Sequence, residues 1–232
     1  VWVNKPSAKY VLEKDAISIW VKDTPRLERV EMGEHISGRA YHVGLPGDIS
    51  YSFDPRSMAI AQIWDGPFLR KHDVVGRGNK FTEKGFKHRS YNAVANLFQP
   101  YDNKGALVDL SFSSPAKIHD VSQSQKFLAD SSDFLEVLKN YPAKFIGVDT
   151  PKQKVPSFRY SVNDNEISLK LNIAKASELE ATFDLNLKNE QSFYIPKQGF
   201  DSKQVSVGEI REDKWVIPAG DHRAVTFKAK LS

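Results

Sequence analysis

The chain has 232 residues and a mass of 26.2 kDa, with 33 Lys+Arg against 29 Asp+Glu, a net charge of +4, and no cysteine. With 40% hydrophobic and 11% aromatic residues it has enough apolar surface to form a core, which excludes a disordered chain. The absence of cysteine excludes disulfides, zinc fingers, iron–sulfur clusters, a catalytic thiol and covalently attached haem, and the small net charge does not favour nucleic-acid binding.

The first part of the chain predicts a meander of short strands, because apolar and polar residues alternate and turn residues separate the runs. The predicted strands are 16–22, 39–44, 49–53 and 58–64. Leu-Pro-Gly-Asp at 45–48 and Asp-Pro-Arg-Ser at 54–57 are typical turn sequences. Because the longest apolar runs are only strand-sized, no membrane-spanning segment is expected.

The middle of the chain is less regular. Residues 73–99 are rich in glycine and basic residues and predict a long surface loop, which in a compact domain is usually functional. A strand is expected at 106–112 and a short helix at 132–140, where Ser132 can act as the N-cap. Because the chain begins at Val1 without an apolar leader, we expect a processed chain or a part of a longer one.

From 144 onward strand patterns return and lengthen. The strands predicted here are 158–162, 166–173, 180–188, 205–210, 215–217 and 224–231. Such regular alternation indicates antiparallel sheet with one buried face, and many strands separated by turns indicate a sandwich. We therefore predict an all-β protein, mainly an antiparallel β-sandwich with one short helix. Residues 1–143 would form an N-terminal β lobe and 144–232 a C-terminal one, with one shared sandwich as the alternative.

One block of the sequence resembles a known module. Its motifs are RVEM at 29–32, GRAYHVGLPG at 38–47, YSFDP at 51–55, AIAQIWDGPFL at 59–69, VGRG at 75–78, FIGVD at 145–149 and PSFRY at 156–160. Together they resemble an uncharacterised β-rich module of secreted bacterial proteins, found beside c-type cytochrome and sugar-dehydrogenase-like domains in planctomycetes and marine bacteria. The resemblance covers residues 26–88 and 144–232 and transfers no catalytic residue.

The resemblance implies export to the periplasm or beyond, in a redox or carbohydrate-processing system. It implies a protein partner such as a c-type cytochrome or a dehydrogenase, with carbohydrate as a further ligand. No Cys-x-x-Cys-His segment occurs, so we expect no cofactor in this chain, and a haem, if there is one, on a partner or another domain. The first functional hypothesis is therefore a non-catalytic binding or docking module.

Five residues are candidates for a binding site at the glycine-rich turns. Arg39 and Arg77 are the guanidinium groups that can pair with a carboxylate, and Asp54 and Asp65 are the carboxylates that follow or end strands. Trp64 is either a core residue or a platform for a sugar ring. The chain thus predicts one site built from strand ends and turns.

Several alternatives stay open from the sequence. Asp54 and Asp65 would act as the paired carboxylates of a carbohydrate hydrolase if their turns met, because that reaction needs two carboxyl groups about 5–9.5 Å apart. A purely structural subunit of a larger assembly is the third possibility. Four basic residues of the loop would dock an acidic protein partner. They are Lys80, Lys84, Lys87 and Arg89. His72 and His88 are weak metal-ligand candidates, so we expect no metal site.

Overall fold

The computed structural model describes residues 8–13, 16–32, 39–72, 80–81, 89–110, 141–174 and 177–232. Within these, the backbone alone is described at 8–13, 16–17, 31–32, 70–72 and 80–81. β-strand is the main secondary structure of the described chain, and η1 (Asn92–Val94) is a short 3₁₀ turn. All pairings between strands are antiparallel except that of β4 with β9. The predicted all-β, antiparallel fold is confirmed.

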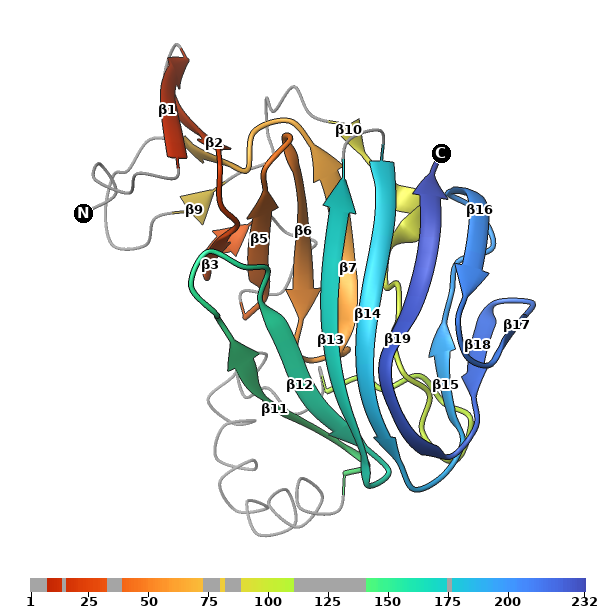
Figure 1. Ribbon diagram of the computed structural model, residues 1–232. Helices are drawn as coiled ribbons and strands as arrows, with labels where there is room; N and C mark the ends of the chain where they lie inside the picture. Colours follow the sequence, from red (N-terminus) through yellow and green to blue (C-terminus); the bar gives the residue numbers. More distant parts are fainter. Residues whose placement is uncertain are drawn as a thin grey trace, which may run out of the picture.

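The largest sheet has six strands in the order β11-β12-β13-β14-β19-β16. Their bounds are β11 Ala143–Asp149, β12 Ser157–Val162, β13 Asn165–Ala174, β14 Glu178–Leu187, β19 Gly220–Leu231 and β16 Phe200–Val205. Buried and exposed residues alternate along β13 and β14, so one face enters the core and the other faces solvent. This large sheet lies in front in Figure 1.

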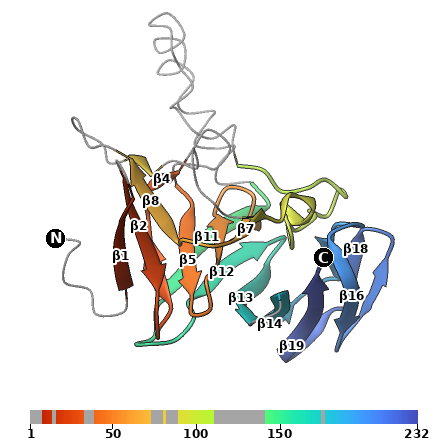
Figure 2. The same cartoon turned by 90° about the horizontal axis from the view of Figure 1, so that it is seen from above.

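Two further sheets face the inner side of the large one. The first has the order β10-β7-β6-β5-β3 and the second the order β15-β18-β17. Their bounds are β10 Arg89–Ser90, β7 Ala59–Asp65, β6 Ile49–Asp54, β5 Tyr41–Leu45, β3 Arg26–Glu28, β15 Gln191–Tyr194, β18 Lys214–Ile217 and β17 Glu209–Arg211. Viewed from above, β5 and β7 form a layer separate from β13 and β14 (Figure 2). The arrangement is a β-sandwich.

One hydrophobic core joins the layers. It contains Phe53 of β6 stacked on Phe158 of β12, with ring centroids 4.1 Å apart. Phe98, which follows η1, packs edge-on against Phe183 of β14 at 5.1 Å. The core therefore contains residues from both sides of the expected boundary at 143/144, and strands from both predicted lobes share one sandwich.

A fourth sheet covers the outer face of β5–β7. Its order is β1-β2-β8-β9-β4. The bounds are β1 Ala8–Glu13, β2 Ala16–Val21, β8 Leu69–His72, β9 Lys80–Phe81 and β4 Glu31–Met32. At Gly44 of β5 a Cβ atom would lie 2.5 Å from Val21 and 2.6 Å from Phe68, so only glycine permits this close packing. Trp64 is buried in the small core formed there.

Two predicted strands are wrong. Residues 106–110 form only an isolated bridge, Tyr101↔Leu107, and are otherwise irregular. The strand predicted at 205–210 is broken, because β16 ends at Val205 and β17 begins at Glu209. Gly208 between them has φ +74, and a Cβ there would lie 2.1 Å from the carbonyl oxygen of Val216. A bend at a glycine, invisible to alternation, therefore separates the two strands.

Two other predictions concern parts of the chain that the structure does not cover. The helix expected at 132–140 lies outside the described residues, as does most of the loop expected at 73–99. The end of that loop is described and contains β10 and η1. No helix in the described ranges is long and apolar enough to cross a membrane.

Candidate functional site

A pocket rich in basic and aromatic side chains lies where β5 and the β6–β7 turn meet β11. Its volume is about 390 Å³, within the range of small-ligand sites. Its lining comprises Arg29, Arg39, Tyr41, Pro55, Arg56, Leu110, Tyr141, Ala143, Lys144 and Phe145. Four of these residues are cationic and none is acidic, and we call this the basic–aromatic pocket. It is the described site with the clearest chemical character.

The cations come from four separate segments of the chain. Arg29 follows β3, Arg39 precedes β5, Arg56 lies in the β6–β7 turn, and Lys144 belongs to β11. Arg56 is fixed by Asp54, whose carboxylate accepts the Arg56 backbone N–H at 2.9 Å and its Nη2 at 3.1 Å. The Arg29 guanidinium lies over the Tyr41 ring, 4.9 Å from its centroid. Two of the four cations, Arg29 and Arg56, are therefore held in place by neighbouring groups.

The aromatic part of the pocket is tied to the sandwich core. The rings of Tyr41 and Phe145 lie 5.7 Å apart, and Tyr41 also contacts Phe158 at 5.9 Å. The Tyr141 hydroxyl donates to the Asp109 carbonyl at 3.1 Å. Burial raises the pKa of Tyr141, and the hydrogen bond with the Asp109 backbone opposes this effect only in part. The nearby Asp109 and Asp102 carboxylates raise the pKa further, so the phenol stays protonated at neutral pH. The pocket thus combines fixed cations with ring surfaces.

Of the predicted binding residues, Arg39 and Asp54 belong to this region. Arg39 lines the pocket directly. Asp54 contributes indirectly, because it is buried and binds Arg56 instead of facing the cavity. Its role as an acceptor of local backbone donors agrees with the predicted Asx turn.

Asp65 lies far from Asp54. The two carboxylates stand at opposite ends of the β6–β7 hairpin, since Asp54 is paired with Ala59 and Asp65 with Ile49. Five residue steps along β6 separate Asp54 from Ile49, or roughly 17 Å. Carboxyl groups that cleave a glycosidic bond lie about 5–9.5 Å apart. The hypothesis of a hydrolase using Asp54 and Asp65 is therefore wrong.

Trp64 is not a platform for a sugar ring. Its side chain is 0% exposed, packs in the small core beside Phe68, and donates its indole N–H to the Pro67 carbonyl at 3.0 Å. The core interpretation of this residue is confirmed. The strand leaves the sheet just after Trp64, and the covering sheet buries that face.

Asp65 and Arg89 connect β7 to β10 at the end of the β6–β7 hairpin opposite Asp54. The Asp65 carboxylate accepts the Arg89 backbone N–H at 2.8 Å and the Tyr91 hydroxyl at 3.4 Å. The Arg89 guanidinium lies 4.8 Å from the Tyr91 ring centroid and donates to the Ser232 carbonyl at 2.7 Å. A cavity of about 390 Å³ lies beside them. These contacts hold β10 to β7 and also fix the position of Arg89.

The remaining predicted residues stay untested. Arg77, Lys84, Lys87 and His88 lie outside the described residues. For Lys80 on β9 and His72 on β8 only the backbone is described. Within the described ranges, no three His, Asp or Glu side chains gather to form a metal site. The docking role of the loop remains a prediction.

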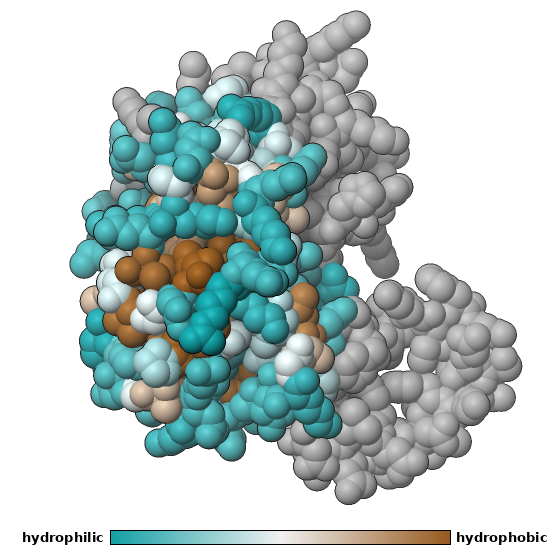
Figure 3. Space-filling view, turned by 90° about the vertical axis from the view of Figure 1, so that its right-hand side faces the viewer, coloured by the Kyte–Doolittle hydropathy of each residue, from teal (hydrophilic) through white to brown (hydrophobic). Residues whose placement is uncertain are grey.

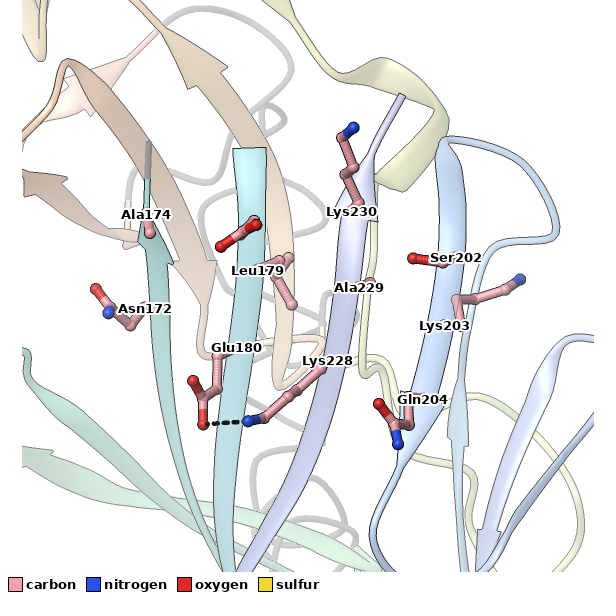
Figure 4. A pocket seen from close by; sticks show the side chains of 11 residues that line it. Asn172, Ala174, Leu179, Glu180, Ser202, Lys203, Gln204, Lys228, Ala229 and Lys230 are labelled. Carbon is pink, nitrogen blue, oxygen red and sulfur yellow. Dashed lines mark ion pairs between the residues drawn. The ribbon is translucent and has the colours of Figure 1, made fainter. Parts of the chain in front are cut away.

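A second, larger hollow lies on the solvent face of the large sheet and has a volume of about 660 Å³. Figure 4 shows polar side chains of four strands along it, among them Asn172, Ser202 and Gln204. Glu180 of β14 pairs with Lys228 of β19 at 3.6 Å, and the two residues are direct partners in register. The hollow is lined by both acidic and basic side chains, whereas the lining of the basic–aromatic pocket contains no acidic one.

Sequence reasoning missed most of the basic–aromatic pocket. Arg29 and Tyr41 lie more than a hundred residues from Lys144 and Phe145, and alternation gives no pairing between such distant segments. The one available signal was Arg56, which directly follows Asp54-Pro55 in the turn.

No protein-family model, curated protein or solved structure matches the chain.

Proposed function

We propose that this chain is a non-catalytic binding module whose ligand is an acidic carbohydrate, bound in the basic–aromatic pocket. The observation that carries the proposal is the lining itself, which contains four cationic side chains, Arg29, Arg39, Arg56 and Lys144, and no acidic one. Asp54, which pairs with Arg56, is not among the lining residues. Arginine forks bind carboxylate and sulfate groups in bidentate fashion, and ring faces pack against sugar rings. The lining contains no Ser, Thr, His, Asp or Glu side chain, the residue types that most often serve as nucleophile or acid–base group.

The size of the pocket favours a sugar over a protein surface. A pocket of about 390 Å³ has the size of a small-ligand site, whereas a protein partner docks on a broader area. Tyr41 and Phe145 contribute aromatic rings to the same lining as the cations. A carboxylated or sulfated sugar unit matches both features.

The setting of this function is part of the same proposal. Resemblance to a secreted module supports a periplasmic or extracellular location in a carbohydrate-processing or redox system. An acidic protein partner, such as a c-type cytochrome or a dehydrogenase, would dock on the basic segment 80–89. A Cys-x-x-Cys-His segment elsewhere in the precursor would support the redox setting.

The test is calorimetric titration of the full chain with a galacturonate oligosaccharide, a chondroitin sulfate oligosaccharide and neutral maltohexaose. We expect one of the acidic sugars to bind, more weakly as salt rises, and maltohexaose not to bind. Arg39→Ala and Lys144→Ala change exposed side chains and should each weaken binding about tenfold. Lys228→Ala in the outer hollow is the matched control and should leave binding unchanged.

Two results would overturn the proposal. One is failure of both acidic sugars to bind at low salt. The other is binding that survives Arg39→Ala and Lys144→Ala together, which would place the ligand elsewhere on the molecule. Comparison of the carboxylated with the sulfated sugar identifies the anionic group.

A further inference from the structure

Strand β17 is an open edge. It is the outermost strand of the order β15-β18-β17, so one side of its backbone has no partner among the described strands. It lies at the far right in Figure 1. Arg211 and Lys214 close the two-residue turn to β18 and are partners in register. In an antiparallel pair, opposite residues alternate between those that exchange backbone hydrogen bonds and those that do not. Since Arg211 and Lys214 close the hairpin as a bonded pair, the neighbouring Ile210 directs its N–H and C=O away from β18, to the open side.

The open edge is next to apolar surface. Ile210, Val205 and Val207 are only partly buried, and they pack against the core where the large sheet and the small sheet end side by side. Seen from this side, an apolar area lies in the middle of the face with hydrophilic residues around it (Figure 3). An apolar area beside unpaired strand backbone is typical of a surface that binds another chain.

The charges on β17 are self-complementary. Glu209 and Arg211 flank Ile210, their side chains are 58% and 68% exposed, and they form an ion pair with each other. If a second β17 lay antiparallel beside the first with Ile210 facing Ile210, each Glu209 would lie opposite the Arg211 of the other copy. Opposite charges directly across an antiparallel pair are stabilising, whereas like charges are destabilising.

We propose that two copies of this chain associate through β17, antiparallel and about a two-fold axis at Ile210, which joins their three-stranded sheets. The interface is isologous and closed, so it forms a dimer and no filament. A second copy fits better than an unrelated peptide because the order Glu-Ile-Arg complements itself when reversed. The association is independent of any ligand in the basic–aromatic pocket.

The outer strands of the large sheet are less suited to this role. The pairing of β16 with β19 shifts register between Phe200 and Ser202, and Lys203 places its ammonium over the Phe200 ring and on the Pro196 carbonyl. At the opposite edge, β11 has a register shift between Phe145 and Gly147. Bulges and inward lysines are devices that protect strand edges from pairing. No register shift interrupts the pairing of β17 with β18.

Sedimentation equilibrium of the full chain, up to about 1 mM, tests the proposal. The unmodified chain should show a reversible monomer–dimer equilibrium. Glu209→Arg and Arg211→Glu should each raise the dimer dissociation constant about tenfold or more, because each places like charges opposite one another. The double variant should restore a constant close to the original. An equimolar mixture of the two single variants should form heterodimers.

The matched control is the exposed pair Arg223–Asp221 on β19, where Arg223→Glu should leave the dissociation constant unchanged. Circular dichroism confirms that each variant is folded. A chain that stays monomeric at the highest concentration overturns the proposal. So does a dimer that single charge reversals leave intact, or one that the double variant does not restore.

Discussion

His42 is a buried histidine held as a neutral ring between two strands and a loop. Its Nε2 lies 2.9 Å from the Val30 carbonyl, which can only accept, so Nε2 carries the proton. Its Nδ1, 2.7 Å from Oγ of Ser52, therefore accepts the serine hydroxyl. Burial lowers the pKa of His42, and the Val30 hydrogen bond and the Glu28 charge oppose that effect only in part. Protonation of this ring disfavours the folded state.

A pH dependence follows from His42. Below the ordinary histidine pKa of about 6.5 the unfolded chain binds a proton that the folded chain resists, so stability falls as pH decreases, by up to about 1.4 kcal/mol per pH unit. Urea unfolding between pH 7.5 and 5.5 should show this slope reduced in His42→Gln. The partly exposed His222, bonded to the Pro218 carbonyl and outside the His42 contacts, is the control, and His222→Gln should keep the original slope. Equal slopes for His42→Gln and the unmodified chain would contradict the prediction.

At the same scale, Asn165 is a fully buried amide that joins three segments. Its Oδ1 accepts the backbone N–H groups of Lys188 and Asn189 at 2.8 and 3.1 Å. Its Nδ2 donates to Oε1 of Gln191 at 3.1 Å, and Gln191 in turn donates to the Tyr101 carbonyl. The amide therefore holds the start of β13 to the end of β14 and the start of β15.

We expect Asn165→Ala to lower the free energy of unfolding by about 2–4 kcal/mol, because buried backbone donors and the Gln191 amide lose their partner. Asn186→Ala is the matched control. Asn186 is more exposed and makes one long contact, 3.4 Å, with Glu166, so its loss should change stability by less than about 0.5 kcal/mol. Chemical denaturation measures both. A small effect of Asn165→Ala would mean that water replaces the amide.

At the scale of elements, the sequence predicted strands best where one face of the strand meets the core and the other meets solvent. The strands β13 and β14 were predicted because their buried and exposed residues alternate over ten residues. Prediction failed at 106–110, where apolar residues touch the core from an irregular segment, and at 205–210, where Gly208 bends the chain. The alternation of apolar and polar residues predicts which side chains are buried. It does not predict whether the backbone stays extended or bends.

The candidate site, like the strands, could be predicted from the sequence only in part. The sequence predicts Arg39 and Asp54 as site residues because they are charged residues at strand ends, and both belong to the region of the basic–aromatic pocket. Their partners Arg29, Tyr141 and Lys144 could not be chosen, since they come from segments whose positions depend on how the sheets stack. Trp64 and Asp65 belong to the same hypothesis because they stand where a strand leaves the sheet, but Trp64 is buried and Asp65 lies at the other end of the hairpin from Asp54.

At the scale of the whole molecule, the sandwich should unfold as one unit. The stacked rings of Phe53 and Phe158 and the edge-on pair of Phe98 and Phe183 join strands from both halves of the chain. We expect near-ultraviolet circular dichroism, tryptophan fluorescence and calorimetry to give coincident transitions. Phe158→Ala should lower stability by about 3–5 kcal/mol and move all three curves together. Curves that separate would instead indicate two independently folding lobes.

The sequence alone determined that this is an antiparallel β protein without cysteine chemistry, because strand periodicity and composition are local properties of the chain. Only the tertiary structure decided which strands share a sheet, that Trp64 is covered by a further sheet, and that Asp54 and Asp65 stand at opposite ends of a hairpin. It also gathered four cations from distant segments around one pocket. The physical reason is that alternation fixes the face of each side chain, whereas register and sheet stacking fix its neighbours.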